Sequence, residues 1–336
     1  MTTDTSRQSA LRAFVTASGA DPLSLEVASA DASFRSYWRV RRDGRSVIVM
    51  DSPPDREPVQ PWLAIGAQLA AAGLHVPAVL AADIEQGFLL LEDFGSRLYL
   101  DVLDEHSADA LYGEALDALF VLQTKLDGRN LERYDEARLQ MELEYLPEWL
   151  LARHLGLQPG CGDWDVIELA FRRILDTVQS QPYGFVHRDF HSRNLMVAPP
   201  APGIIDFQGA LYGPLTYDLV SLLRDCYIVW PAARVDAWAE THRARLVAQG
   251  RIAADAAQFR LWFDFTGLQR HIKVLGLFCR LCYRDGKPHY LDDLPRVLRY
   301  VLDVAGRYAE LADFVTLLQR ATAGADLRRR RDADAA

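Results

Sequence analysis

Long hydrophobic runs, cysteine and lysine are all scarce in this 336-residue sequence. No apolar run approaches the roughly 20 residues that a membrane-spanning helix requires. Residues 1–20 lack the basic segment followed by an apolar core that marks a secretory signal. We therefore expect a cytoplasmic protein with no membrane association.

The four cysteines lie at positions 161, 226, 279 and 282, and only the last two are close in sequence. A zinc site would need a second such pair or histidines at ligand spacing, which His271 and His289 do not provide. Isolated thiols in a reducing compartment are usually buried packing residues. Neither a disulfide framework nor a structural zinc site is expected.

Positive charge is also limited, because 46 acidic residues outnumber 37 basic ones and the net charge is −9. This balance argues against a nucleic-acid partner, and nothing in the sequence indicates an obligate protein partner. Lysine occurs only at positions 125, 273 and 287, so nearly every cation is an arginine. The remaining composition, 50% hydrophobic and 25% charged, is that of an ordinary globular chain.

The periodicity of the sequence changes near residue 92. Before it, short β patterns accompany one inserted helix, and Asp43-Gly44 indicates a tight hairpin turn. After it, long amphipathic helices dominate. The expected helices are 7–18, 58–72, 107–126, 137–154 and 164–181, with mostly helix from 215 to 320; the expected strands are 34–40, 46–50, 78–83, 88–91, 185–187, 194–197 and 203–205.

These patterns predict an α+β fold of two lobes. A small β-rich lobe would cover residues 1–92 and bind a nucleotide, and a large helical lobe would cover residues 93–325. Residues 326–336, which include four consecutive arginines, are expected to form a flexible tail.

The chemistry is concentrated between His187 and Asp206. His187, Asp189 and Asn194 have the spacing H-x-D-x-x-x-x-N, and Asp206 ends a short apolar stretch. Phosphoryl transfer needs a carboxylate that orients the attacking hydroxyl and oxygen ligands that hold Mg²⁺ on the phosphates. An Asp after a strand is often only a turn former, but this combination at this spacing favours a kinase.

These motifs resemble the aminoglycoside phosphotransferase and choline kinase-like superfamily, whose catalytic motifs parallel those of protein kinases. The resemblance extends from the β-rich lobe through Asp218 and implies a bilobal protein kinase-like fold that binds ATP and Mg²⁺. It implies that Asp189 is the catalytic base and that His187 and Asp218 brace its loop. Asn194 and Asp206 would hold Mg²⁺, and main-chain atoms of Glu92 and Phe94 would contact the adenine.

Two features of that superfamily are missing. Met50 occupies the strand position where a lysine is usual, and small residues around Ala32 and Ser33 replace the glycine-rich loop. Phosphate contacts would then come from the metal, from backbone N–H groups at these small residues, or from Arg35 or Arg39. Either arginine could equally be a solvated strand residue, and a pseudokinase that binds without turnover stays open.

A narrower set of segments is similar to bacterial anomeric sugar kinases of cell-wall recycling, and Met50 fits that family. The resemblance implies transfer to the C1 hydroxyl of N-acetylmuramate and N-acetylglucosamine. The lactyl carboxylate of N-acetylmuramate leads us to expect a cation in the helical lobe. The segments are 31–40, 47–55, 88–95, 187–196, 204–227 and 267–287, and the substrate candidates are Glu144, Tyr212, Trp230, Arg270, His271 and Lys273.

Each substrate candidate has a plainer interpretation. Glu144, Arg270 and Lys273 could face solvent, and the aromatic residues and His271 could pack in the core. A kinase for choline or an aminoglycoside, and a non-catalytic nucleotide-binding module, remain alternatives. The preferred sugar, the choice of ATP or GTP, the oligomeric state and the group that replaces the lysine stay open.

Overall fold

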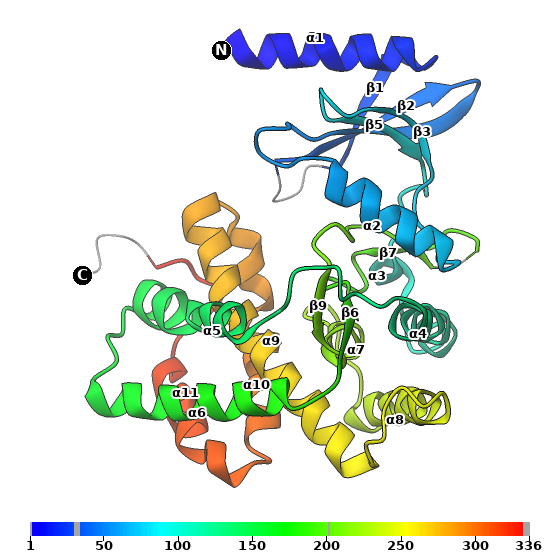
Figure 1. Cartoon of the computed structure of the whole chain (residues 1–336). Coiled ribbons are helices and arrows are strands. Elements are labelled where there is room, and N and C mark those ends of the chain that lie inside the picture. The colour runs from blue at the N-terminus through cyan, green and yellow to red at the C-terminus, as the bar shows by residue number, and fades with distance from the viewer. Residues whose placement is uncertain (1, 30–33, 201, 332–336) are drawn as a thin grey trace. The chain divides into compact units, whose positions relative to one another are not determined.

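The computed structural model describes residues 2–29, 34–200 and 202–331. The chain divides into two compact units, one formed by residues 1–118 and 193–209 and the other by residues 119–192 and 210–336. The first combines strands with helices and the second is mainly helical, as the sequence predicts (Figure 1). The finer lobe limits, 1–92 and 93–325, stay predictions.

A five-stranded antiparallel sheet with the order β1-β2-β3-β5-β4 forms the centre of the first unit. The predicted hairpin is confirmed, because Asp43 and Gly44 have φ angles of 50° and 76° and join β2 to β3. Strand β1 is not predicted from the sequence; it is an edge strand whose Leu23 and Val27 are exposed, so its burial pattern is weak. The strands are β1 Asp21–Ser29, β2 Ser36–Arg42, β3 Arg45–Asp51, β4 Val79–Asp83 and β5 Phe88–Glu92.

The first unit also contains a short hairpin contributed by residues far along the chain. Strands β7 Leu195–Met196 and β8 Gly203–Ile204 pair with each other, and the N–H of Ile204 donates to the carbonyl of His75 at 2.8 Å. These bonds attach the segment 193–209 to the sheet unit. The helices of the first unit are α1 Thr2–Ala17, α2 Gln60–Ala71 and α3 Tyr99–Val102. Helix α4 Ala108–Lys125 begins in the first unit and continues into the second, whose first residue is 119.

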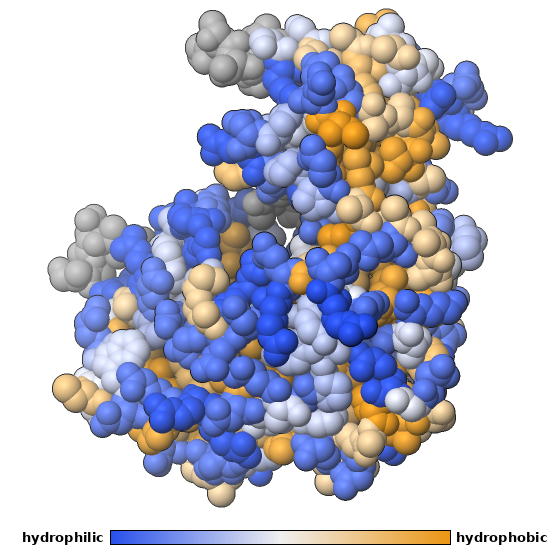
Figure 2. All heavy atoms as spheres, in the orientation of Figure 1, coloured by the Kyte–Doolittle hydropathy of each residue, from blue (hydrophilic) through white to orange (hydrophobic). Residues whose placement is uncertain are grey.

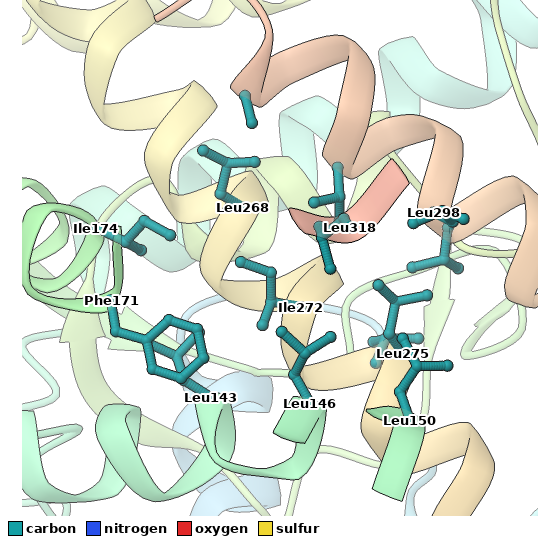
Figure 3. Close-up of a cluster of buried hydrophobic side chains, with 14 of the residues drawn as sticks. Leu143, Leu146, Leu150, Phe171, Ile174, Leu268, Ile272, Leu275, Leu298 and Leu318 are labelled. Atoms are coloured by element: carbon teal, nitrogen blue, oxygen red, sulfur yellow. The ribbon is translucent and has the colours of Figure 1, made fainter. Parts of the chain in front are cut away.

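The second unit is organised around the long helix α9, which is buried along most of its length. Figure 3 shows Leu268, Ile272 and Leu275 of α9 among apolar side chains from α5, η1, α6, α10 and α11. The helices and strands of this unit are α5 Glu136–Leu143, the π-helix η1 Leu146–Leu155, α6 Cys161–Gln179, β6 Tyr183–Val186, β9 Leu211–Pro214, α7 Tyr217–Leu223, α8 Ala232–Ala248, α9 Ala256–Asp285, η2 Pro288–Asp293, α10 Leu294–Ala305, η3 Ala309–Leu311 and α11 Ala312–Thr322.

One predicted helix is divided in the structure. The expected helix at 137–154 consists of α5 and the π-helix η1, which has Pro147 in its first turn. Proline has no N–H to continue an α-helical ladder, so the hydrogen-bond pattern changes there. At the other end of the unit, Leu327 is buried and its carbonyl oxygen lies 3.0 Å from Nε2 of His154, so the chain stays packed beyond residue 325.

On the face shown in Figure 2 the two units differ in where polar and apolar side chains gather. Figure 2 shows a mostly hydrophilic face on the helical unit, while hydrophobic residues gather over the sheet unit. None of the helices in the described residues combines the length and hydrophobicity needed to cross a membrane. Cys226, Cys279 and Cys282 are buried free thiols, as predicted, and Cys161 is exposed.

Gly276 in α9 provides a test of this packing. A Cβ at this position would lie 2.1 Å from the carbonyl oxygen of Tyr145, so Gly276→Ala should lower the free energy of unfolding by about 1–3 kcal/mol despite the better helix propensity of alanine. Gly113 in α4 has open space around it, so Gly113→Ala should instead stabilise by about 0.5–1 kcal/mol. Urea denaturation measures both; stabilisation by both variants would contradict the close α9 packing.

Candidate active site

The loop that follows β6 is shaped by one buried carboxylate. Asp218, in the first turn of α7, accepts hydrogen bonds from the backbone N–H groups of His187 at 2.6 Å and Arg188 at 2.9 Å. Arg188 has a φ of 77°, a conformation that a non-glycine residue keeps only when its surroundings fix it. Asp218 therefore holds the loop immediately before Asp189.

Asp189 is half-buried and its N–H points to Nδ1 of His187 at 3.3 Å. Burial by itself would raise the pKa of Asp189, but the positive charges of His191, Arg270, Arg188 and Lys273 together hold that pKa below its ordinary value. The carboxylate is therefore ionised at neutral pH, which is the state that a base must have before it accepts a proton from a hydroxyl.

Three cations from the loop and from α9, Arg188, Arg270 and Lys273, act on this carboxylate, and two of them share the counterion Glu142. Nζ of Lys273 lies 2.7 Å from Oε1 of Glu142, and Nη2 of Arg188 lies 3.2 Å from the same oxygen. The guanidinium of Arg270 lies over the ring of Tyr217, with 5.7 Å between Cζ and the ring centroid. The predicted Arg270 and Lys273 are thus brought together, both close enough to act on Asp189.

The acidic residue of this cluster is Glu142, not the predicted Glu144. Glu142 is 3% exposed, and the hydroxyl of Tyr134 donates to its carboxylate. Glu144 is exposed and accepts a hydrogen bond from Gln140 at 3.2 Å. Two steps along a helix turn a side chain through about 200°, so only Glu142 faces the core; its place beside Leu139 and Leu143 on an apolar stripe is a signal that the sequence contains.

The two predicted metal ligands lie side by side in the first unit. Nδ2 of Asn194 is 3.4 Å from Oδ2 of Asp206, and the N–H of Ile205 donates to the carbonyl of Asn194 at 3.1 Å. Asp206 has a φ of 62°, and the next side chain, Phe207, packs on Trp62 with 4.9 Å between ring centroids. A carboxylate and an amide fixed in this way offer the oxygen ligands that Mg²⁺ prefers.

The predicted phosphate-contacting arginines are engaged by carboxylates. Arg39 makes two bonds to Asp93, at 2.7 and 3.1 Å, and a third to the carbonyl of Gly95 at 3.0 Å. Nε of Arg35 lies 3.3 Å from a carboxylate oxygen of Glu57. Their contact with phosphate stays a prediction, and the other two predicted contacts, Ala32 and Ser33, lie outside the described residues.

Glu92 is the last residue of β5, and Phe94 lies two residues beyond it. The N–H of Glu92 donates to the carbonyl of Ala78 at 2.9 Å, so this N–H is not available to an adenine. The ring of Phe94 packs against the ring of His75, with centroids 4.3 Å apart. The adenine contact therefore stays a prediction for the remaining main-chain groups.

The remaining substrate candidates lie in other surroundings. Tyr212 on β9 packs against Tyr183, and Trp230 packs against Trp238 and lines a cavity of about 150 Å³. His271 is stacked on Tyr300, with its Nε2 2.8 Å from the carbonyl oxygen of Arg224, and burial lowers its pKa to about 3. His271 is therefore a neutral packing residue in this structure, the plainer of its two interpretations.

Comparison with known proteins identifies the fold and the family. The sequence model of the phosphotransferase enzyme family matches residues 24–262. The choline kinase LicA from Streptococcus pneumoniae superposes with a TM-score of 0.61 at 12% identity, covering 88% of this chain and 98% of that one. The aminoglycoside phosphotransferase APH(2'')-Ib, determined with ADP bound, gives 0.57 at 15% identity, covering 82% of this chain and 92% of that one.

A curated relative is much more similar in sequence. The N-acetylmuramate/N-acetylglucosamine kinase of Pseudomonas putida is 43% identical over 303 residues, which span 90% of this chain and 89% of the relative. Together with the solved structures, this relative confirms the predicted protein kinase-like fold and the resemblance drawn from the catalytic motifs.

The titration of Asp218 predicts the acidic limb of the activity profile. Burial raises its pKa to about 7, because the two N–H bonds and Arg270 offset only part of the lost hydration. As the pH falls through about 7, protonation replaces one acceptor oxygen by a hydroxyl and loosens the loop, whereas Asp189 stays ionised. We expect kcat/KM to fall roughly tenfold per pH unit below that point.

The matching variant is Asp218→Asn, an amide that cannot titrate. It should be less active at every pH between 6 and 8 and should lack the limb near 7; a limb that persists would assign the titration to another group. Since the folded chain binds this proton more tightly than the unfolded chain, the free energy of unfolding should also decrease as the pH rises from about 4 to about 7.

Proposed function

Since this chain belongs to the phosphotransferase enzyme family, we propose that it transfers the γ-phosphoryl group of ATP to the anomeric C1 hydroxyl of N-acetylmuramate and N-acetylglucosamine. The observation that carries the proposal is the 43% identity to a kinase named for these two sugars, over about nine-tenths of both chains. The products would be sugar 1-phosphates of cell-wall recycling, made in the cytoplasm.

The charges around Asp189 support a neutral or anionic acceptor. Arg188, Arg270 and Lys273 lie in this region, and their full positive charges would oppose a cationic acceptor such as choline or an aminoglycoside. N-acetylglucosamine is uncharged and N-acetylmuramate carries a carboxylate. The helical unit is therefore better suited to these sugars than to the acceptors of the fold neighbours.

In the proposed mechanism Asp189 accepts a hydrogen bond from the C1 hydroxyl and takes its proton as the oxygen attacks the γ-phosphorus. The bond from this phosphorus to the oxygen that bridges it to the β-phosphate breaks, and ADP leaves. Asn194 and Asp206 would hold Mg²⁺, which when bound neutralises charge on the phosphate oxygens. Asp218 and His187 keep the base in place through the backbone bonds described above. Most of the rate enhancement would come from positioning and electrostatics, because phosphoryl transfer needs little covalent help from the protein.

Phosphorus NMR of the protein with MgATP and each sugar tests the reaction. We expect a new anomeric phosphate signal that disappears in mild acid, because glycosyl 1-phosphates hydrolyse where ordinary phosphomonoesters survive. Asp189→Asn should reduce its rate of formation by about 10²–10⁴-fold without loss of folding, while Asp165→Asn, the same change at an exposed carboxylate of α6, should have no effect. An acid-stable product, or product with choline or an aminoglycoside only, would contradict the proposed acceptor.

We propose that Arg270, one of the cations near Asp189, contacts the lactyl carboxylate of N-acetylmuramate, and a ratio of two substrates tests this role. Arg270→Gln removes one charge from the cluster, so kcat/KM for N-acetylmuramate should fall about tenfold more than kcat/KM for N-acetylglucosamine. Any general loss of structure affects both sugars equally and cancels in the ratio. An unchanged ratio would remove Arg270 from recognition of the lactyl carboxylate.

A further inference from the structure

A second buried carboxylate, Asp225, contacts the far end of the loop that carries Asp189. Asp225 is 1% exposed and follows α7. Its Oδ2 accepts hydrogen bonds from the N–H of Ser192 at 3.0 Å and from the Oγ–H of Ser192 at 2.5 Å. Its Oδ1 accepts a bond from the N–H of Tyr227 at 3.0 Å. One carboxylate thus ties the loop to the segment that follows α7.

That segment is itself anchored to the core of the helical unit. Nε2 of His271 lies 2.8 Å from the carbonyl oxygen of Arg224, and Nη1 of Arg296 donates to the carbonyl of Cys226 at 2.7 Å. The hydroxyl of Tyr300 contacts the next carbonyl but one, that of Ile228, at 3.3 Å. Three carbonyls in five residues are therefore held by α9 and α10, so Asp225 is attached to a rigid support.

The two carboxylates bind the loop on either side of Asp189 in the sequence. Asp218 holds the loop at His187 and Arg188, and Asp225 holds it at Ser192. Between these points the chain contains the strained Arg188 and then Asp189. A strained backbone persists only where the surrounding structure over-determines it. On the far side of Arg188 its carbonyl accepts long bonds from Oγ of Ser221 at 3.4 Å and Nη1 of Arg270 at 3.5 Å, and Asp225 fixes the loop beyond Asp189, at Ser192.

The carboxylate of Asp225 is held by hydrogen bonds to both of its oxygens. Among the residues that the structure describes, Asp225 makes no ion pair, and the bonds to its carboxylate come from neutral donors, two N–H groups and one hydroxyl. Hydrogen bonds to the charged form offset part of the desolvation cost of a buried carboxylate. A neutral amide of the same shape has only one acceptor oxygen, so it could not accept bonds from both Ser192 and Tyr227 in this way.

We infer that Asp225 is a positioning residue that aligns Asp189 with the acceptor hydroxyl by fixing Ser192 against residues 225–228. Tyr227, whose N–H bonds to Asp225, also packs edge-on against the ring of His191, with 5.5 Å between centroids. The loop and the segment after α7 are therefore joined at Ser192 and at His191. The inference rests on the proposed function, because it assigns Asp189 as the base.

The test is a double-mutant cycle with Asp225→Asn and Ser192→Ala. Asp225→Asn should lower kcat about 100-fold, leave the KM for ATP within twofold of the parent, and change Tm by no more than a few degrees. Ser192→Ala, which loses only the hydroxyl, should lower kcat about tenfold. If both act through the shared bond, the double variant should be no slower than Asp225→Asn.

The control is Asp255→Asn, because Asp255 accepts a backbone N–H, that of Gln258, at the start of α9 and lies in the same unit; its kcat should match the parent. A kcat within twofold of the parent for Asp225→Asn, or fully multiplicative effects in the cycle, would overturn the inference. So would a large fall in Tm with kcat retained per folded molecule. If Asp225→Asn does not fold, Ser192→Ala decides alone, and unchanged kcat there overturns the inference.

The parental rate with each sugar reports separately on the proposed function. If the parent phosphorylates neither sugar, the same ratios of variant to parent are measured on the slow transfer of phosphate from ATP to water. That reaction needs an oriented nucleophile but no sugar, so the expected order of the variants is unchanged.

Discussion

The backbone N–H groups of His187 and Arg188 both donate to the carboxylate of Asp218, and this pair of bonds underlies the geometry of the helical unit's catalytic part. Without it nothing on that side would keep Arg188 at a φ of 77°, a conformation that costs free energy in a residue with a Cβ. The cost is met by a buried side chain of α7, which itself packs on α9. The orientation of Asp189 therefore depends on the packing of the helical core.

The region around Asp189 also contains several buried charged side chains. Glu142, Lys273, Arg188 and Arg270 are all wholly or largely withdrawn from water, and such a group is seldom the most stable way to fill a core. The cluster lowers the pKa of Asp189 and gives the region an excess of fixed positive charge. Stability is given up where electrostatic preorganisation is useful, as is common at functional sites.

The sequence was most informative where chemistry fixes spacing. Asp189, Asn194 and Asp206 stand out as candidates because a base and two metal ligands would need a short, rigid connection between them, and their roles stay predictions. It was less informative on substrate residues, because a helix offers several polar positions and only packing decides which one turns inward. Glu142 and Glu144 differ by two positions, yet one is buried against Lys273 and the other is exposed.

By itself the sequence determined the α+β class, the hairpin at Asp43-Gly44 and the order of the main helices, and it supplied the candidate residues for the chemistry. These depend on local periodicity, turn preferences and motif spacing, which neighbours in the chain largely set. Only the tertiary structure decided that Arg39 is bound to Asp93, that His271 is stacked in the core, and that Asp218 and Asp225 hold the two ends of one loop. Each of these contacts joins residues more than 25 positions apart, and their pairing is set by how the helices and strands pack, which no local pattern encodes.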